Sequence, residues 1–219
     1  MKRIIYVAGS EGTGTRFIAS IIGSLDSVDG HNAEKHEQDF DTVWDNLQNN
    51  RIDEAVEQFN QISDPDKHVL MRRSYPHGAR PVWYNITNLK KLAEKTGREL
   101  QVIVTTRDIN VLTLSLCRVD PNKNIKIASD RIKKAYDVIF THLERNNIDY
   151  FIFSYETLML LGYTYFKFVM DTIGLDVTLD PGQIKLRDGN RKYLNNEGLP
   201  VENTFEKVTV QPEEEFEYV

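Results

Sequence analysis

A glycine-rich turn near the amino terminus has the residue types and the spacing of a phosphate-binding loop. Residues 9–16 read Gly-Ser-Glu-Gly-Thr-Gly-Thr-Arg, after an apolar run at residues 4–8 and before apolar residues at helical spacing. Glycines let backbone N–H groups turn toward a phosphate, and a helix start adds partial positive charge. A turn without a ligand is the alternative. The predicted anion-binding residues are Gly9, Ser10, Gly12, Thr13, Gly14, Thr15 and Arg16.

The turn lacks the lysine that nucleoside-triphosphate hydrolases place after the last glycine. Thr15 and Arg16 stand where those enzymes have a lysine and then a serine or threonine. Thr15 can donate a hydroxyl hydrogen bond but carries no charge, and Arg16 either supplies a charge or points outward from the helix. The sequence also offers no obvious set of magnesium ligands. It therefore disfavours ATP or GTP hydrolysis and predicts no metal site.

A second pair of residues could hold a phosphate at the end of a predicted central strand. Arg107 follows the apolar strand at residues 100–105, and Ser115 lies two turns along the next predicted helix. Ligands of open α/β sheets bind at the carboxyl ends of the strands. An arginine and a serine so placed can bind one phosphate by charge and by hydrogen bond. A salt bridge to another side chain is the other role open to Arg107.

The order of predicted elements indicates the fold class. Strands are expected at residues 4–8, 68–71, 100–105 and 150–153, alternating with amphipathic helices, while the polar stretch 26–39 is expected to be a loop. Such alternation predicts a three-layer α/β/α domain with a mostly parallel central sheet, like that of the P-loop nucleotide hydrolases. We expect one domain over residues 1–210, followed by an acidic, disordered tail at residues 211–219.

Composition limits the classes of partner. The net charge of the 219-residue chain is −6, and four tail glutamates leave about −2 on the rest (−6 less −4). This argues against non-specific binding of nucleic acid or an anionic membrane, although a local basic cleft is compatible with it. A single cysteine, Cys117, excludes an internal disulfide and a cysteine zinc cluster. With neither a signal-peptide pattern nor an apolar run of transmembrane length, we expect a cytoplasmic protein.

Taken together, these motifs resemble the sulfotransferase family, which transfers a sulfuryl group from 3′-phosphoadenosine 5′-phosphosulfate (PAPS). Gly14-Thr15-Arg16 is similar to the end of the family loop that binds the 5′ phosphosulfate. Arg107 and Ser115 have the eight-residue spacing of the family pair that binds the 3′-phosphate. Residues 151–158 (Phe-Ile-Phe-Ser-Tyr-Glu-Thr-Leu) are similar to the family strand Val-Val-Arg-Tyr-Glu-Asp-Leu, and residues 168–175 to its Phe…Gly-Leu phrase.

The resemblance covers residues 1–175 and implies a PAPS-dependent transferase that needs no metal. Its product would be adenosine 3′,5′-bisphosphate. In the family a late Arg-Lys-Gly segment also grips the 3′-phosphate, and residues 187–192, with Arg187 and Arg191, are its expected counterpart. The implied acceptor is a hydroxyl or amine of a small molecule or glycan. The sequence does not identify that acceptor or the oligomeric state.

Two departures from the family concern the catalytic groups. Gly12 stands where cytosolic members carry a catalytic lysine, so the cation at the bridging oxygen is absent or comes from Arg16, Arg72 or Arg73. The family histidine that acts as base aligns with Ser74. We expect His77, three residues later, to be the base. Its rivals are His31, His36, Glu34 and Glu37, while His68 and His142 are expected to be structural.

The sequence is also compatible with two other functions. One is a P-loop small-molecule kinase, which would need Mg²⁺-ATP despite the missing lysine. The other is a catalytically degenerate nucleotide-binding module, because Gly12 replaces the family lysine.

Trp83 and Tyr84 either line an acceptor pocket or belong to the aromatic core.

Overall fold

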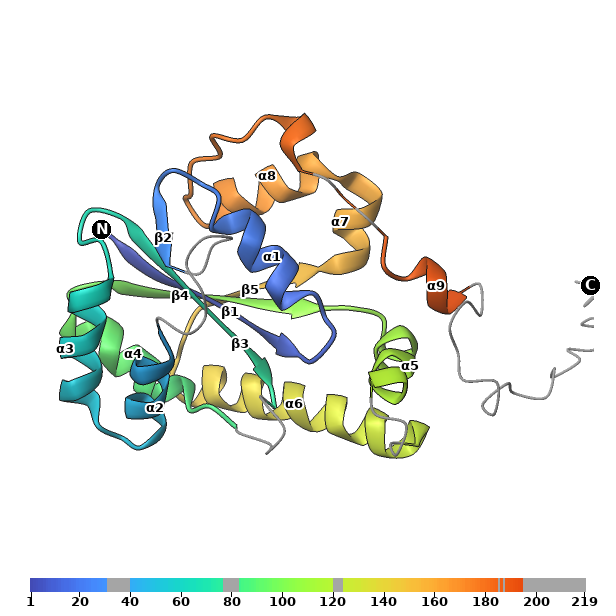
Figure 1. The fold of residues 1–219 in the computed structure, drawn as a ribbon, viewed down its shortest axis with the longest axis horizontal. Coiled ribbons are helices and arrows are strands. Elements are labelled where there is room, and N and C mark those ends of the chain that lie inside the picture. The colour runs from blue at the N-terminus through green and yellow to red at the C-terminus, as the bar shows by residue number, and fades with distance from the viewer. Residues whose placement is uncertain (31–39, 77–82, 120–123, 185, 187, 195–219) are drawn as a thin grey trace, which may run out of the picture.

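Five parallel strands make the central sheet of the computed structural model, which describes residues 1–30, 40–76, 83–119, 124–184, 186 and 188–194. In sheet order the strands are β2 (Val28–Gly30), β3 (His68–Tyr75), β1 (Arg3–Ser10), β4 (Glu99–Thr106) and β5 (Tyr150–Ser154) (Figure 1). Residues 4–10 of β1 and 102–105 of β4 are buried, as in strands covered on both faces. The predicted mostly parallel sheet is confirmed.

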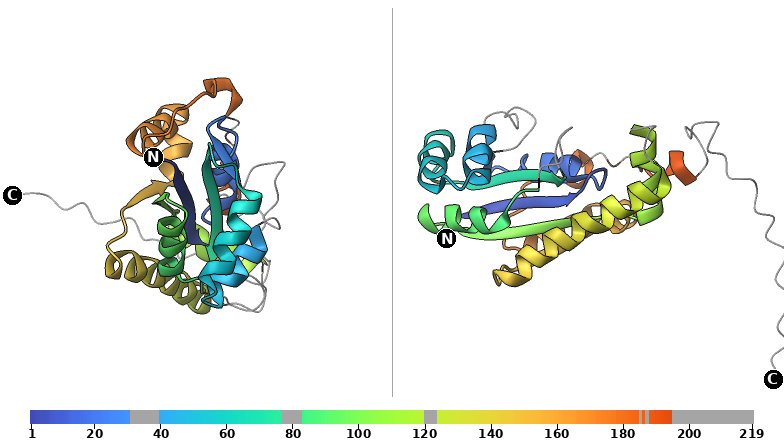
Figure 2. Two further views of the ribbon diagram at one scale, coloured as in Figure 1. Left: turned by 90° about the vertical axis from the view of Figure 1, so that its left-hand side faces the viewer. Right: turned by 90° about the horizontal axis from the view of Figure 1, so that it is seen from below.

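Helices cover both faces of the sheet. One face packs against α1 (Thr15–Ile22), α7 (Tyr155–Leu161) and α8 (Tyr163–Thr172). The other packs against α2 (Asp41–Gln48), α3 (Ile52–Ile62), α4 (Ile86–Lys95) and α6 (Ile125–Arg145). The ribbon views show α7 and α8 on the opposite side of the sheet from α6 (Figures 1 and 2). The predicted three-layer α/β/α architecture is therefore confirmed.

Three further elements complete the described chain. α5 (Ile109–Val119) follows β4 and packs against α6, and η2 (Pro181–Gln183) and α9 (Arg191–Leu194) come after α8. No helix among the described residues is long and apolar enough to span a membrane. The expected domain boundary at residue 210 and the acidic tail lie outside the described residues.

One strand lies where the sequence predicted a loop. β2 falls within the polar stretch 26–39, and only Val28 of its three residues is apolar. It nevertheless pairs with the start of β3, and the buried Asp29 carboxylate accepts a hydrogen bond from Asp64 N at 2.8 Å. A strand this short, with one apolar residue, has no alternation from which it could be predicted.

The strand order puts the glycine-rich turn between two neighbouring strands. Gly9, at the carboxyl end of β1, pairs with Ser74 of β3 on one side and with Thr105 of β4 on the other. The chain order of the strands reverses at β1, and ligands of open α/β sheets bind outside the carboxyl ends at such a point. In Figure 1 this edge faces α5 and α9. The turn and both predicted phosphate positions therefore share one edge.

Candidate functional site

The glycine-rich turn has the backbone geometry of an anion-binding helix start. Gly12 and Gly14 take φ values of 86° and 88°, in the left-handed region that favours glycine. Gly14 is the N-cap of α1, whose first turn holds no acidic residue. The partial positive charge of that turn is therefore not offset locally, and it is available to an anion.

Buried threonines hold the turn in place from beneath. The Thr13 hydroxyl donates to Ser10 O at 2.8 Å and lies 2.8 Å from the Thr105 hydroxyl, which donates to Ala8 O at 3.1 Å. A Cβ on Gly9 would lie 2.2 Å from Thr105 Oγ1, so only glycine fits there. Ser10 and Thr13 are buried, and the N–H of Thr13 donates to Ser10 O. The Thr13 side chain therefore supports the turn from inside, whereas Ser10 Oγ is buried without a hydrogen-bond partner among the described residues.

Arg72 lies beside the turn on the face of the sheet that carries α1. Its Nη1 donates to Thr15 Oγ1 at 3.3 Å and to Ser74 Oγ at 3.5 Å, and those two hydroxyls are 3.0 Å apart. Burial, together with the smaller effect of the charges on Arg16 and Arg73, lowers the pKa of Arg72 to about 10. An anion bound among these groups would stabilise the charged form of Arg72 and so raise its pKa. We call Arg72, Thr15 and Ser74 the Arg72 side.

Arg73 points to the opposite face of the sheet, because successive side chains of a strand alternate. Its guanidinium is 2% exposed and binds Asp41 at 2.5 Å. It also lies 5.1 Å from the centre of the Trp44 ring and 5.5 Å from that of Tyr84. Of the two neighbouring arginines predicted as the catalytic cation, the structure thus brings Arg72 to the turn and not Arg73. Arg16, on the first turn of α1, is exposed.

Arg107 and Ser115 both lie beside Gly12, on the other side of the turn. Arg107 Nη1 donates to Gly12 O at 2.8 Å, and a Cβ on Gly12 would lie 3.6 Å from Ser115 Oγ. The guanidinium carbon of Arg107 lies 4.6 Å from the centre of the Tyr155 ring. We call Arg107 and Ser115 the Arg107 side.

Residues 188–194 cover the Arg107 side. Asn190 Oδ1 accepts from Arg107 Nε at 2.7 Å, and Tyr193 Oη donates to Ser115 Oγ at 3.0 Å. The late segment thus lies next to the predicted 3′-phosphate position, although Arg191 itself points outward, with 81% of its side chain exposed and Asp188 at 3.9 Å. Arg187 lies outside the described residues.

Several residues at the site were not predicted from the sequence. Tyr155 and Glu156 lie within the motif at residues 151–158. The motif marked this segment as part of the family pattern, but it did not predict the contacts that these two side chains make. Glu156 Oε1 accepts from Asp108 N at 2.9 Å and from Asn190 Nδ2 at 3.0 Å. Arg131 of α6 binds Glu11 of the turn at 2.9 Å, and no local pattern signals this long-range pair.

The residues predicted as bases, namely His77 and its rivals His31, His36, Glu34 and Glu37, all lie outside the described residues. His68, expected to be structural, stands at the start of β3, where its Nδ1 accepts from Arg3 N at 3.2 Å.

Tyr84 belongs to the core, and its carbonyl accepts from Tyr75 Oη at 3.1 Å. Trp83 is partly buried against that core, with Lys134 Nζ 5.1 Å from its ring.

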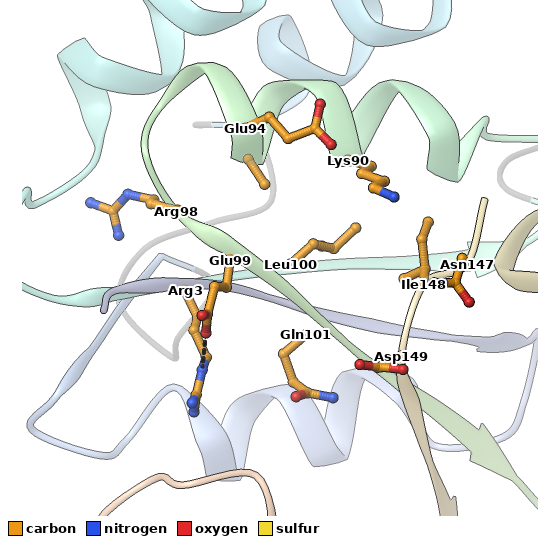
Figure 3. Close-up of a pocket in the computed structure, with 11 residues that line it drawn as sticks. Arg3, Lys90, Glu94, Arg98, Glu99, Leu100, Gln101, Asn147, Ile148 and Asp149 are labelled. Atoms are coloured by element: carbon orange, nitrogen blue, oxygen red, sulfur yellow. Dashed lines mark hydrogen bonds and ion pairs between the residues drawn. The ribbon is translucent and has the colours of Figure 1, made fainter.

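A cavity of about 460 Å³ lies at the opposite, amino-terminal edge of the sheet (Figure 3). Its cationic groups are engaged: Arg3 Nε binds Glu99 at 3.2 Å and Lys90 Nζ donates to Asn146 O at 2.8 Å. Ligands of this fold class bind at the other edge, so the cavity is not part of the candidate site.

Within the described part of the chain, no three His, Cys, Asp or Glu residues group as metal ligands would.

Neither the sequence models of known families nor the sequences of curated proteins match this chain. Solved structures do match. The sulfotransferase domain of the Synechococcus PCC 7002 olefin synthase is 14% identical with a TM-score of 0.53, and the match covers 91% of this chain and 86% of that one. The sulfotransferase STF1 of Mycobacterium tuberculosis H37Rv is 12% identical with a TM-score of 0.50, over 92% and 75% of the two chains. The chain therefore has the fold of these sulfotransferase domains.

Proposed function

We propose that this protein is a sulfotransferase that uses PAPS to sulfate a hydroxyl or amine of a small molecule or glycan. One observation carries the proposal: two arginines, Arg72 of β3 and Arg107 just after β4, flank the same glycine-rich turn. A donor with phosphates at both its 5′ and 3′ ends needs two such positions. The 5′ phosphosulfate would lie on the turn near Thr15, and the 3′-phosphate would lie at Arg107 and Ser115.

Sulfuryl transfer requires stabilisation of charge on the transferring group and the leaving phosphate. The acceptor oxygen or nitrogen forms a bond to sulfur, the bond from sulfur to the 5′-phosphate oxygen breaks, and a base takes the acceptor proton. Gly12 has no side chain to stabilise that oxygen. In our proposal Arg72 supplies the charge, and the Thr15 and Ser74 hydroxyls donate hydrogen bonds, because the three meet beside the turn. His77 remains our proposed base, with His31 as its rival.

The residue after Thr15 supports this reading over a kinase. In P-loop kinases and hydrolases the serine or threonine at the second position after the last glycine binds Mg²⁺ through its hydroxyl. Here Arg16 stands at that position, and a guanidinium has no acceptor atom with which to bind a metal ion. Composition supports the remaining expectations, namely a cytoplasmic protein that binds neither nucleic acid nor membrane.

Calorimetry tests donor binding. We expect adenosine 3′,5′-bisphosphate to bind and Mg²⁺-ATP to bind much more weakly, because only the former places a phosphate at Arg107. Binding of Mg²⁺-ATP without binding of the bisphosphate would refute the proposal. Transfer of radiolabelled sulfate from PAPS to a panel of sugars, phenols and amines tests turnover.

A second candidate is a bisphosphate-binding module without turnover. Gly12, at the position of the family lysine, favours it. Binding of the bisphosphate together with no transfer to any member of a broad acceptor panel would support this candidate over the enzyme.

A further inference from the structure

The glycine-rich turn carries an acidic side chain, although its geometry suits the binding of an anion. Glu11 is the only Asp or Glu within residues 9–16, and the one basic residue there, Arg16, has an exposed side chain. A carboxylate beside a bound phosphate repels it, and the repulsion grows with the charge of the phosphate. The turn can therefore bind a doubly charged group tightly only if this carboxylate is neutralised or held at a distance.

Arg131 of α6 neutralises the Glu11 carboxylate. Its Nη2 donates to Glu11 Oε2 at 2.9 Å, in a charge-assisted hydrogen bond between residues 120 positions apart in the chain. The two side chains are only 19% and 30% exposed, so salt screens this pair less than it screens a surface ion pair. Buried neighbours fix the position of the arginine, because Ala128 and Ile132 pack against α5.

The ion pair also sets the direction in which the carboxylate points. α6 packs on the face of the sheet opposite the one that carries α1, whereas the partial positive charge available to an anion is at the start of α1. The backbone of Glu11 is tied to the sheet, since its N–H donates to Tyr75 O, at the end of β3, at 3.3 Å. Arg131 therefore determines where the Glu11 side chain lies, and it holds that side chain toward α6.

We propose that Arg131 is a positioning residue, which holds the Glu11 carboxylate on the α6 side of the turn and away from the 5′ end of the donor. The proposal rests on the proposed function. Without the arginine the carboxylate is released and can turn toward the start of α1, where it repels the bound anion. Arg131 thus acts on donor binding through Glu11 and not by contact with the donor.

A double-mutant cycle tests this role, with calorimetric titration of adenosine 3′,5′-bisphosphate as the measurement. Arg131→Gln should weaken binding by about three- to tenfold, the effect of one released carboxylate near the phosphate. Glu11→Gln alone should bind at least as tightly as the wild type. Both substitutions together should bind within about twofold of the wild type, because no carboxylate then remains to be held. Arg145→Gln, which removes an exposed arginine at the other end of α6, is the matched control and should leave the affinity unchanged.

The cycle distinguishes the roles open to Arg131. Equal weakening by Arg131→Gln in the presence and absence of Glu11→Gln would mean that the arginine contacts the phosphate itself. Its Nε, which is buried without a hydrogen-bond partner among the described residues, is the candidate donor for such a contact. That result would overturn the proposal, and so would an unchanged affinity in the single Arg131 variant.

Titrations at low and high salt distinguish a charge effect from a purely structural one. The ratio of wild-type to Arg131→Gln affinity should approach one at high salt, because screening weakens the repulsion by the released carboxylate. A ratio that stays the same would mean that the ion pair only shapes the turn, and would overturn the proposal. If the wild type does not bind the bisphosphate, the proposed function fails and this proposal fails with it. Wild-type binding together with a failed cycle leaves the proposed function in place.

Discussion

The two sides of the glycine-rich turn are built in different ways. The Arg72 side is made wholly by strand pairing and the first turn of α1, and its arginine is 5% exposed. The Arg107 side is half-buried and is completed by residues 188–194, which lie outside the sheet. One position is therefore fixed by the core of the fold, and the other is completed by side chains from the end of the described chain.

Arg72→Gln should have the largest effect. We expect kcat for sulfuryl transfer to fall roughly 100- to 1000-fold, the usual range when one donor to a developing charge is removed. Binding of the bisphosphate, which lacks the sulfuryl group, should change by less than about fivefold. Steady-state kinetics and calorimetry on the same preparation measure both.

Arg73→Gln separates the two neighbouring arginines. Because Arg73 binds Asp41 and two aromatic rings in the core, we expect a lower Tm and a kcat per folded molecule that changes far less than in the Arg72 variant. A large loss of kcat with unchanged Tm would assign the catalytic cation to Arg73 instead.

Arg107→Ala should weaken bisphosphate binding by about 10- to 150-fold, because a hydrogen bond to a charged group contributes about 1.5–3 kcal/mol. Arg118→Ala, an exposed arginine at the end of α5, is the matched control and should leave the affinity unchanged. Calorimetry measures both. Equal affinity in wild type and the Arg107 variant would remove the 3′-phosphate from this side of the turn.

Thr105→Val should disturb both sides, because the Thr105 hydroxyl supports the turn between them. Loss of its bonds to Thr13 and Ala8 should lower the free energy of unfolding by about 1–3 kcal/mol, the cost of leaving buried partners unsatisfied. Thr106→Val is the control, since that side chain alternates to the other face of β4. Urea denaturation gives the comparison. A Thr105 variant as stable as the wild type would show that the turn is held by its backbone alone.

The sequence predicted the parts of this site that depend on local pattern. Apolar runs identified the central strands, and the spacing of Arg107 and Ser115 indicated one residue after β4 and the other two turns along the next helix. The sequence did not show which of the neighbouring residues Arg72 and Arg73 faces the turn. Both faces of β3 are buried, so no alternation of polar and apolar residues distinguishes one face from the other. Asn190 and Tyr193 were out of reach for another reason. They meet partners 83 and 78 residues away in a stretch without periodicity, so only the folded chain brings them together.

Glu156→Gln should have the smallest effect, and it acts on the Arg107 side alone. Glu156 shares Asn190 with Arg107, so its carboxylate lies close enough to repel a phosphate bound there. Glutamine keeps an oxygen that can accept from Asp108 N and Asn190 Nδ2 and removes the charge. We expect bisphosphate affinity to rise about two- to fivefold at low salt and less at high salt, because screening weakens such a repulsion.

Glu144→Gln, an exposed glutamate near the end of α6, is the control for the change in net charge. Titrations at two salt concentrations distinguish the two roles open to Glu156. Tighter binding that fades with salt means that the carboxylate acts on the phosphate by charge. Weaker binding at both concentrations means that its main role is to hold Asn190 and the turn before α5. In that case the Arg107 side depends on its supporting hydrogen bonds as much as the Arg72 side depends on strand pairing.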